Sequence, residues 1–443
     1  MKKEVKYAIV GVSLAAFAGL AWYLINRKTC SSYTNEDDCR LNHCHWWNET
    51  CQSWNAQLPW TYPCLNFDSL DFCREGDGLR LDSVSMVGEN EYDISRPYSF
   101  LMTDVQGKDL FFHYNTTSDL FANPWHETPY QMLYTYDGIN WERIPDCEYN
   151  AGVYSFWITP TQNTIRISNF FAKDYAPIQY MMYSKQNSPY VRISNVSHSN
   201  DCPPSVPKMD IAMMEITNFS IPESQKVHAV CICRQHPYET YPSFTLEGCI
   251  DSILMDSKYR DYIHWYFIPC MNPRGVYYTI QRHNAPGTCG VDINRSWDKN
   301  PGEDGYAIET DLVKTKLIEI NNRYGIDFFF DMHSQPGGGG GHSYVISTEV
   351  TPWCPIYSEL TGYNCGTGVH DVSRARVWVH DVLDVPYSFT NEVAQKDWHI
   401  TIPELHQNGW AIAESVYQVF YEPLEISLDE LEKLHPLKNL VEY

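Results

Sequence analysis

The sequence predicts an α/β body, preceded by a β-sandwich domain and an N-terminal transmembrane helix. Three observations support this. Strand and helix patterns alternate from about residue 208 to 425, and short β-rich runs with turn signals fill about 80 to 200. Residues 7–25 form a run without charged side chains, and this run is long enough for a membrane span. The 443 residues suffice for two or three domains, and a hydrophobic content of 43% excludes global disorder.

The apolar run at residues 7–25 has two interpretations. A cleaved signal peptide is one, because Ala16-Phe17-Ala18 offers a small-x-small cleavage site. The apolar run continues well past that site, so we favour an uncleaved anchor. We therefore assign residues 1–28 to a cytosolic tail and a single-pass transmembrane anchor.

Cysteine usage predicts on which side of the membrane the body lies. Six of the fifteen cysteines fall within residues 30–73. A Cys/His metal site using His43 or His45 is an alternative, but its spacing fits no zinc pattern. We expect a disulfide-rich stalk over 29–75 and a glycosylated body that is lumenal or extracellular. Four N-x-S/T sequons agree with this, at Asn48, Asn115, Asn195 and Asn218.

The β-rich region is predicted to be a sandwich domain that ends in a linker, together spanning 76–207. Turn signals such as Asp137-Gly138 separate its strands, and three prolines mark the linker at 200–207. Its predicted strands are 98–102, 110–114, 131–136, 154–158 and 164–168. We find no acid/base or metal cluster in it, so its aromatic residues are interpreted as core.

The α/β body is predicted to span 208–425, followed by a tail at 426–443. Mostly apolar runs predict buried strands, and apolar residues at helical spacing predict helices. The strands are 227–233, 265–269, 326–330 and 387–390; helices follow the first strand and occupy 308–324 and 410–420. The five glycines at 337–341 predict a loop, and no Lys-Ser/Thr follows them as phosphate binding would require.

His236 and Glu239 lie on the turn between the predicted strand 227–233 and the helix after it. Ligand sites of α/β sheets occur where strands end in this way. An imidazole and a carboxylate on one turn can bind a single cation, and such N/O ligands suit zinc. Taken alone, the pair is equally compatible with an incidental surface turn.

Other polar residues follow later strands in an ordered set. His333 ends the strand at 326–330 and is the natural third ligand, and Glu392 follows the strand at 387–390. Arg282, Asn294 and Arg295 lie between Glu239 and His333 in the sequence. The net charge of −23 argues against nucleic acid as a partner.

The ordered motifs resemble those of zinc metallocarboxypeptidases of the carboxypeptidase A kind, and most of all the cytosolic carboxypeptidase branch. The matching motifs are His236-Pro-Tyr-Glu239, Asn272-Pro-Arg-Gly275, Asn294-Arg295, Asp331-Met-His333 and the strand from Ser388 to Glu392. Residues 136–141 and 170–175 are similar to that branch's N-terminal domain. The resemblance covers about 80–425 and implies a mixed central sheet flanked by helices.

The resemblance also implies a role for each site residue. One Zn²⁺ per chain would be held by His236, Glu239 and His333. Glu392 would be the general base and acid, and Arg282 would stabilise the oxyanion. Asn294 and Arg295 would bind the C-terminal carboxylate of a peptide or protein substrate, and Asp292 would orient His236.

The segment 373–378 predicts a preference for acidic C-terminal residues. It contains Arg374 and Arg376, and it is similar to a basic segment by which the cytosolic branch accepts glutamate. Arg376 aligns best with the arginine of that segment and is the predicted substrate-binding residue. On a strand the two side chains would face the same side. Structural salt bridges with Asp381 or Asp384 are the alternative.

Two other functions remain open at this level. One is an N-acyl-amino-acid amidohydrolase on the same fold. The other is a catalytically inactive, membrane-anchored binding ectodomain, although no predicted ligand or base is missing from the sequence.

Overall fold

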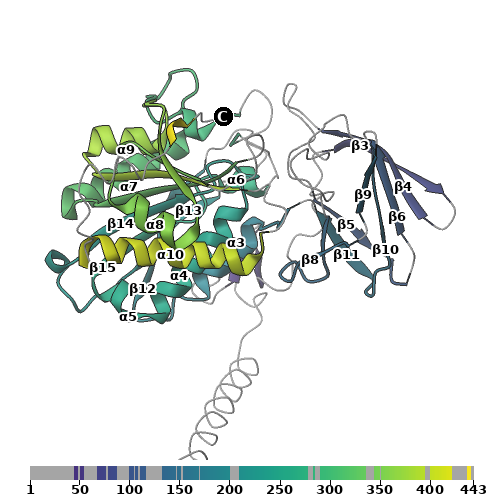
Figure 1. Ribbon diagram of the computed structural model, residues 1–443, viewed down its shortest axis with the longest axis horizontal. Coiled ribbons are helices and arrows are strands. Elements are labelled where there is room, and N and C mark those ends of the chain that lie inside the picture. Colours follow the sequence, from purple (N-terminus) through teal and green to yellow (C-terminus); the bar gives the residue numbers. More distant parts are fainter. Residues whose placement is uncertain are drawn as a thin grey trace, which may run out of the picture. The chain divides into compact units, whose positions relative to one another are not determined.

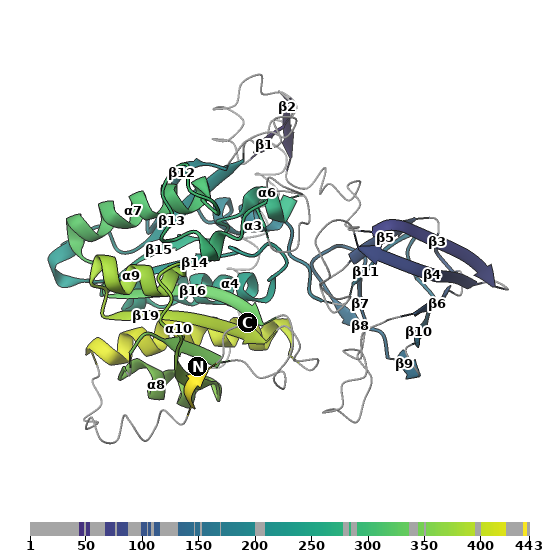
Figure 2. The same cartoon turned by 90° about the horizontal axis from the view of Figure 1, so that it is seen from above.

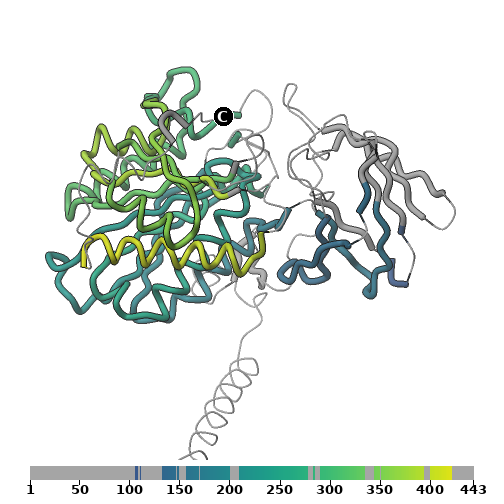
Figure 3. Tube along the Cα trace, in the orientation of Figure 1, coloured from purple at the N-terminus to yellow at the C-terminus, as the bar shows by residue number. Residues whose placement is uncertain are grey.

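A computed structural model gives the architecture of the chain, and Figure 3 traces the path of its backbone, coloured along the sequence. The residues described are 44–47, 50–53, 67–75, 78–86, 99–103, 105–107, 110–115, 132–145, 147–150, 153–168, 170–199, 209–277, 283–284, 290–335, 344–349, 351–394, 400–421 and 437–440. None of the helices in these residues has the length and hydropathy needed for a membrane span. The run at 7–25 lies outside them.

The chain divides into two compact units, Met1–Trp60 and Thr61–Tyr443. In the first, the described residues form an antiparallel hairpin of β1 (Cys44–Trp47) and β2 (Thr50–Ser53). The predicted disulfides of the stalk involve side chains outside the described residues.

The second unit contains a nine-stranded sheet within the described residues (Figures 1 and 2). In spatial order its strands are β12 (Val191–His198), β13 (Asp210–Ile216), β15 (Ile263–Ile268), β14 (Val227–Cys233), β16 (Phe328–Gln335), β19 (Tyr387–Ala394), β17 (Tyr344–Ser347), β18 (Asn364–Gly368) and β20 (Leu437–Leu440). Strands β15, β14, β16 and β19 run parallel, whereas β12–β13, β13–β15 and β17–β19 are antiparallel. The predicted mixed central sheet is therefore confirmed.

Helices cover both faces of this sheet. On one face pack α3 (Tyr175–Tyr183), α4 (Tyr241–Met255), α8 (Trp353–Thr361) and α10 (Ile402–Tyr421); on the other pack α7 (Ile308–Tyr324) and α9 (Ala375–Leu383). Short helices α5 (Ser257–Asp261) and α6 (Pro273–Tyr277) and the 3₁₀ turns η2 (Glu223–Gln225) and η4 (Ile293–Arg295) lie in connections.

Side-chain alternation along the central strands joins the two helical layers. In β14, Ala229, Cys231 and Cys233 pack toward α4 and α10, whereas Val230 and Ile232 pack toward α7 and α9. All seven residues of β14 are buried, as expected for a parallel strand covered on both faces. This is why the strand reads as a continuous apolar run and could be predicted at its observed bounds.

The region before residue 170 is β-rich, as predicted. One sheet contains, in spatial order, β6 (Leu110–Asn115), β10 (Val153–Ile158) and β9 (Cys147–Asn150). A second contains β5 (Ser99–Thr103), β11 (Thr164–Ser168), β7 (Leu133–Thr135) and β8 (Glu142–Arg143). A third pairs β3 (Phe67–Glu75) with β4 (Gly78–Met86). The turn predicted at Asp137-Gly138 joins β7 and β8, with the Asp137 carboxylate accepting from the backbone N–H groups of Ile139 and Asn140. The sandwich arrangement of these sheets stays a prediction.

Candidate metal centre

The candidate site lies where three parallel strands end. His236 and Glu239 follow β14, and His333 lies near the end of β16. Glu392 of β19 is the parallel-strand partner of His333. Because β14, β16 and β19 run in one direction, their carboxyl ends meet at one edge of the sheet. The topology thus brings together residues that are 156 positions apart in the sequence, from 236 to 392.

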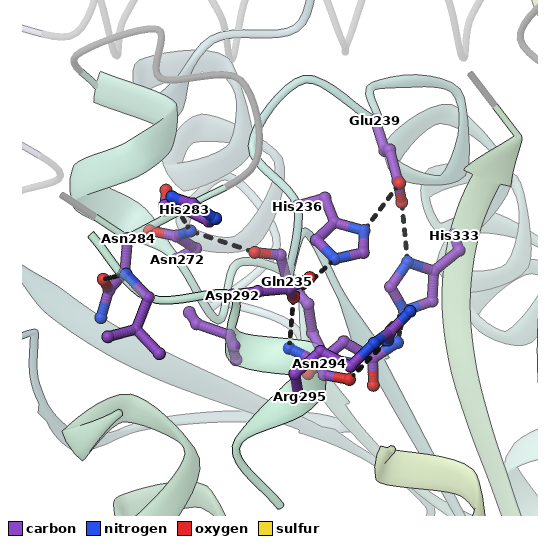
Figure 4. Close-up of polar contacts among 12 residues, drawn as sticks. Gln235, His236, Glu239, Asn272, His283, Asn284, Asp292, Asn294, Arg295 and His333 are labelled. Atoms are coloured by element: carbon purple, nitrogen blue, oxygen red, sulfur yellow. Dashed lines mark hydrogen bonds and ion pairs between the residues drawn. The ribbon is translucent and has the colours of Figure 1, made fainter. Parts of the chain in front are cut away.

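Glu239 lies between the two imidazoles (Figure 4). One carboxylate oxygen, Oε1, is 2.7 Å from Nδ1 of His236, and the other, Oε2, is 2.7 Å from Nδ1 of His333. The backbone N–H of Ser334 donates to Oε2 as well, at 3.1 Å. All three side chains are buried, and their ligand atoms lie within 4.8 Å of one another.

The outer nitrogen of each imidazole has a carboxylate partner. Nε2 of His236 lies 3.0 Å from Asp292, and Nε2 of His333 lies 2.9 Å from Asp331. Such partners set which ring nitrogen carries the proton and raise the basicity of a ligating histidine. The resemblance implied that Asp292 orients His236, and the two side chains are in direct contact.

The carboxyl groups of Glu239 and Glu392 experience opposite electrostatic influences. Burial alone would raise the pKa of Glu239, but the adjacent His236 and His333 outweigh it and hold that pKa well below its usual range. Burial raises the pKa of Glu392 to about 7, with the charge of Glu239 adding to the increase. A carboxyl poised near neutral pH can accept a proton and return it, which a general base and acid must do.

Asn294 and Arg295 lie on η4, beside the two histidines. The Asn294 amide nitrogen is 3.1 Å from Nε2 of His333, and its carbonyl oxygen accepts from the backbone N–H of Ala375. Arg295 is partly exposed and donates to the main-chain oxygen of Asn294. Asn294 is thus buried against a predicted ligand, and Arg295 keeps a face toward solvent. Arg282 lies outside the described residues.

The strand expected at 373–378 is wrong, because α9 begins at Ala375 and Arg374 is its N-cap residue. Residues two apart on a helix do not face the same side, so the two arginines separate. Arg376 is fully buried and donates to the backbone oxygens of Ser347 and Val369. Arg374 is partly buried, and Arg295 and Glu392 are among the charged groups that act on it.

Sequence reasoning missed Gln235, which connects the motifs. Its amide nitrogen donates to Asp331 at 2.7 Å, and its amide oxygen accepts from the indole of Trp297 at 2.8 Å. Its main-chain oxygen accepts from Asn272 at 3.0 Å. The side chain is fully buried. A polar residue directly before His236 carried no periodic signal that could have marked it as buried.

The donor set fits a zinc ion. Two imidazoles and one carboxylate, all buried, are the ligands of open catalytic zinc sites, where a fourth position remains for water or substrate. The short contacts of Glu239 with both histidines also show that the three ligand groups point to one place. Residues His236, Glu239 and His333 would hold the ion.

Comparison with known proteins agrees with this geometry. The zinc carboxypeptidase family matches residues 191–333, and the cytosolic carboxypeptidase N-terminal domain matches residues 79–170. Human cytosolic carboxypeptidase 6 is 24% identical over 316 residues, covering 62% of this chain and 58% of that protein. An uncharacterized protein of Zymomonas mobilis is 22% identical over 267 residues, covering 58% of this chain and 63% of its own length.

Solved structures show the same fold. A metallocarboxypeptidase from Burkholderia cenocepacia superposes with a TM-score of 0.64 at 17% identity, over 80% of this chain and 96% of that chain. The sheet, the ordered motifs and the two family matches together define a zinc-dependent hydrolase fold. Residues 191–333 match the zinc carboxypeptidase family, whose cofactor is zinc, and the chain is similar to cytosolic carboxypeptidases. It spans about three fifths of the length of these two curated relatives.

The predicted localisation is wrong. A single-pass membrane protein with a lumenal or extracellular body is contradicted by the cytosolic carboxypeptidase N-terminal domain at 79–170 and by relatives named cytosolic carboxypeptidases. The membrane partner at residues 7–25 and the glycoprotein and disulfide expectations lose their support with it. Short apolar runs, cysteines and sequons each occur without a membrane context. The thiols of Cys231, Cys233, Cys249, Cys270, Cys354 and Cys365 are buried.

Proposed function

We propose that this protein is a zinc-dependent carboxypeptidase that removes the C-terminal residue of peptides or proteins. The observation that carries this proposal is the convergence of His236, Glu239 and His333 at the sheet edge, with Glu392 in register on the next strand. The family match supports the same activity. The division predicted from the sequence, into a β domain with linker at 76–207 and a catalytic domain at 208–425, stays part of the proposal, with one change at each boundary: β12 (Val191–His198) and β20 (Leu437–Leu440) are strands of the central sheet.

Each site residue has a defined task in this mechanism. Zinc supplies Lewis acidity, which activates water near neutral pH and polarises the scissile carbonyl. Glu392 accepts the proton of the attacking water and delivers it to the leaving amine. Arg295 pairs with the C-terminal carboxylate of the substrate, whose planar geometry a guanidinium matches. Arg282 stabilises the oxyanion.

Asn294 contributes by position. Its amide contacts His333 on one side and the start of α9 on the other, so it holds the η4 turn against the metal ligands. This fixes where Arg295 presents its guanidinium. We expect selection for a free C-terminus, because Asn294 of the η4 turn, which carries Arg295, contacts the proposed zinc ligand His333.

We also propose a preference for acidic C-terminal residues. The positive charge at Arg374 and Arg376 motivates it, and the structure ranks the two. Arg374 pairs with Asp371 at 3.3 Å and shares its surroundings with Arg295 and Glu392. Three donated hydrogen bonds hold Arg376 to Ser347, Thr348 and Val369 of its own chain. Arg374 is therefore the stronger candidate for contact with a substrate side chain.

The test is release of the last amino acid from peptides that differ only there, measured by mass spectrometry with the zinc-loaded full chain. We expect cleavage of free C-termini and none of C-terminal amides, with kcat/KM highest for Glu or Asp. In Arg374→Ala the acidic preference should shrink, and in Arg376→Ala it should persist. Turnover of N-acyl amino acids but not peptides would establish an amidohydrolase instead. Failure to turn over either class with zinc bound would indicate a binding protein.

A further inference from the structure

The described residues contain a second cluster of three possible metal ligands, Glu223, His228 and His264. We propose that this cluster is a second zinc site, distinct from the carboxypeptidase centre. His228 and His264 are the second residues of β14 and β15, and they are directly paired in the parallel register. They lie at the amino ends of these strands, whereas the centre at His236 lies at the carboxyl ends. The two sites are thus at opposite edges of one sheet.

The ligand atoms converge as they do at the first centre. Nδ1 of His264 lies 2.8 Å from Oε2 of Glu223, and Nε2 of His228 lies 3.9 Å from the same oxygen. Two ligands of a tetrahedral zinc ion, each about 2.0 Å from it, are about 3.3 Å apart. The separation of 2.8 Å is shorter than this value and that of 3.9 Å is longer, so a small side-chain movement would accommodate the ion.

The outer nitrogens of the imidazoles are also held. Nε2 of His264 lies 3.2 Å from Oε2 of Glu215, an ion-pair distance that does not meet hydrogen-bond geometry. Nδ1 of His228 lies 3.4 Å from the Tyr266 hydroxyl, which is also 3.2 Å from Nδ1 of His264. His228 stacks on Tyr324 of α7 with ring planes 3° apart, which fixes its orientation.

Charge and access suit a divalent cation. Glu215 and Glu223 supply two carboxylates, and Lys226 pairs with the other oxygen of Glu223, Oε1, which leaves Oε2 toward the histidines. Both histidines are buried at 3% exposure, whereas the Glu223 side chain is 27% exposed. The ion would enter from the Glu223 side. Without a metal, Nδ1 of His264 makes a direct hydrogen bond with Oε2 of Glu223, and the experiment must separate this state from the metal-bound one.

The test is the zinc content of the full chain after dialysis against excess zinc and gel filtration, measured by mass spectrometry. We expect about two zinc ions per chain for the wild type and about one for His228→Gln or Glu223→Gln. His333→Ala should also bind about one, and the double variant His333→Ala/His228→Gln almost none. Glu223→Gln changes a side chain on a partly exposed turn. It is therefore informative even if His228→Gln, at a buried position, fails to fold.

A matched control is His370→Gln, which removes an exposed histidine that pairs with Asp381 and should leave the count at about two. Saturation of the wild type at about one zinc would overturn the proposal and leave the cluster as a hydrogen-bonded group without a metal. An unchanged count in both Glu223→Gln and His228→Gln would overturn it equally. The readout is metal content, so it is independent of whether the carboxypeptidase activity is confirmed.

Discussion

At the residue scale, one glutamate carries both a shifted pKa and a defined position. Glu392 is held in register with His333, and burial raises its pKa to about 7. Its neighbour Glu239 is shifted the other way by the two histidines. In the proposed mechanism the two carboxylates therefore have different tasks, since the low-pKa group would stay charged as a ligand and the high-pKa group would exchange protons.

The first prediction is that Glu392→Gln lowers kcat/KM by ~10²–10⁴-fold, because an amide cannot accept the proton of water. Zinc content should be unchanged, since the three ligands remain. Steady-state kinetics and metal analysis on the same preparation measure both. Glu359→Gln, an exposed carboxylate on α8, is the matched control and should behave as wild type. Turnover near the wild-type rate would remove Glu392 from the mechanism.

At the element scale, the crossing of α4 and α10 supports the site. Helix α4 follows the turn that carries His236 and Glu239, so its position sets theirs. Gly248 of α4 faces the backbone of His406, and Gly409 of α10 faces the backbone of Thr245 and Cys249. The two helices thus meet backbone to backbone, and a Cβ at either glycine would overlap the other helix.

The second prediction is that Gly409→Ala destabilises the fold by ~1–3 kcal/mol or more, because overpacking forces the helices apart. Chemical denaturation followed by circular dichroism measures the change in the unfolding midpoint. Gln407→Ala, an exposed position two residues earlier on α10, is the control and should shift the midpoint little. A Gly409→Ala variant as stable as this control would show that the helices do not meet as described.

At the scale of the whole molecule, folding and metal binding are linked. The ligands His236, Glu239 and His333 come from two strands joined by almost a hundred residues, so only the folded chain presents them together. A ligand that binds the folded state alone raises the free energy of unfolding. The chain's many acidic residues, which give a net charge of −23, add a general attraction for cations.

The third prediction is that removing zinc with a chelator lowers Tm and that adding zinc restores it. At a free zinc concentration 100 times Kd the stabilisation is ~2.7 kcal/mol, which corresponds to a rise in Tm of several degrees. Differential scanning calorimetry of chelated and zinc-loaded protein measures it. Magnesium at the same concentration is the control, because it prefers oxygen ligands and should restore little. Identical melting with and without zinc would contradict the linkage.

The central strands and the ligand set could be predicted because their signals are local or ordered along the chain. A strand buried on both faces is an apolar run, as in 227–233, and the helix at 308–324 keeps its period throughout. The His236-x-x-Glu239 turn, the strand-end His333 and Glu392 appear in the sequence as motifs. The localisation prediction failed because an apolar run and several cysteines are compositional patterns that carry no information about tertiary context.

Only the tertiary structure decided how these residues face one another. The sequence by itself determined the α/β class, the order of the motifs and the identity of the donors, because these depend on periodicity and residue type. The start of α9 at Ala375, the buried links of Gln235 and the pairing of His228 with His264 depend on which elements lie side by side. Such contacts join residues far apart in the chain, and no local pattern encodes them.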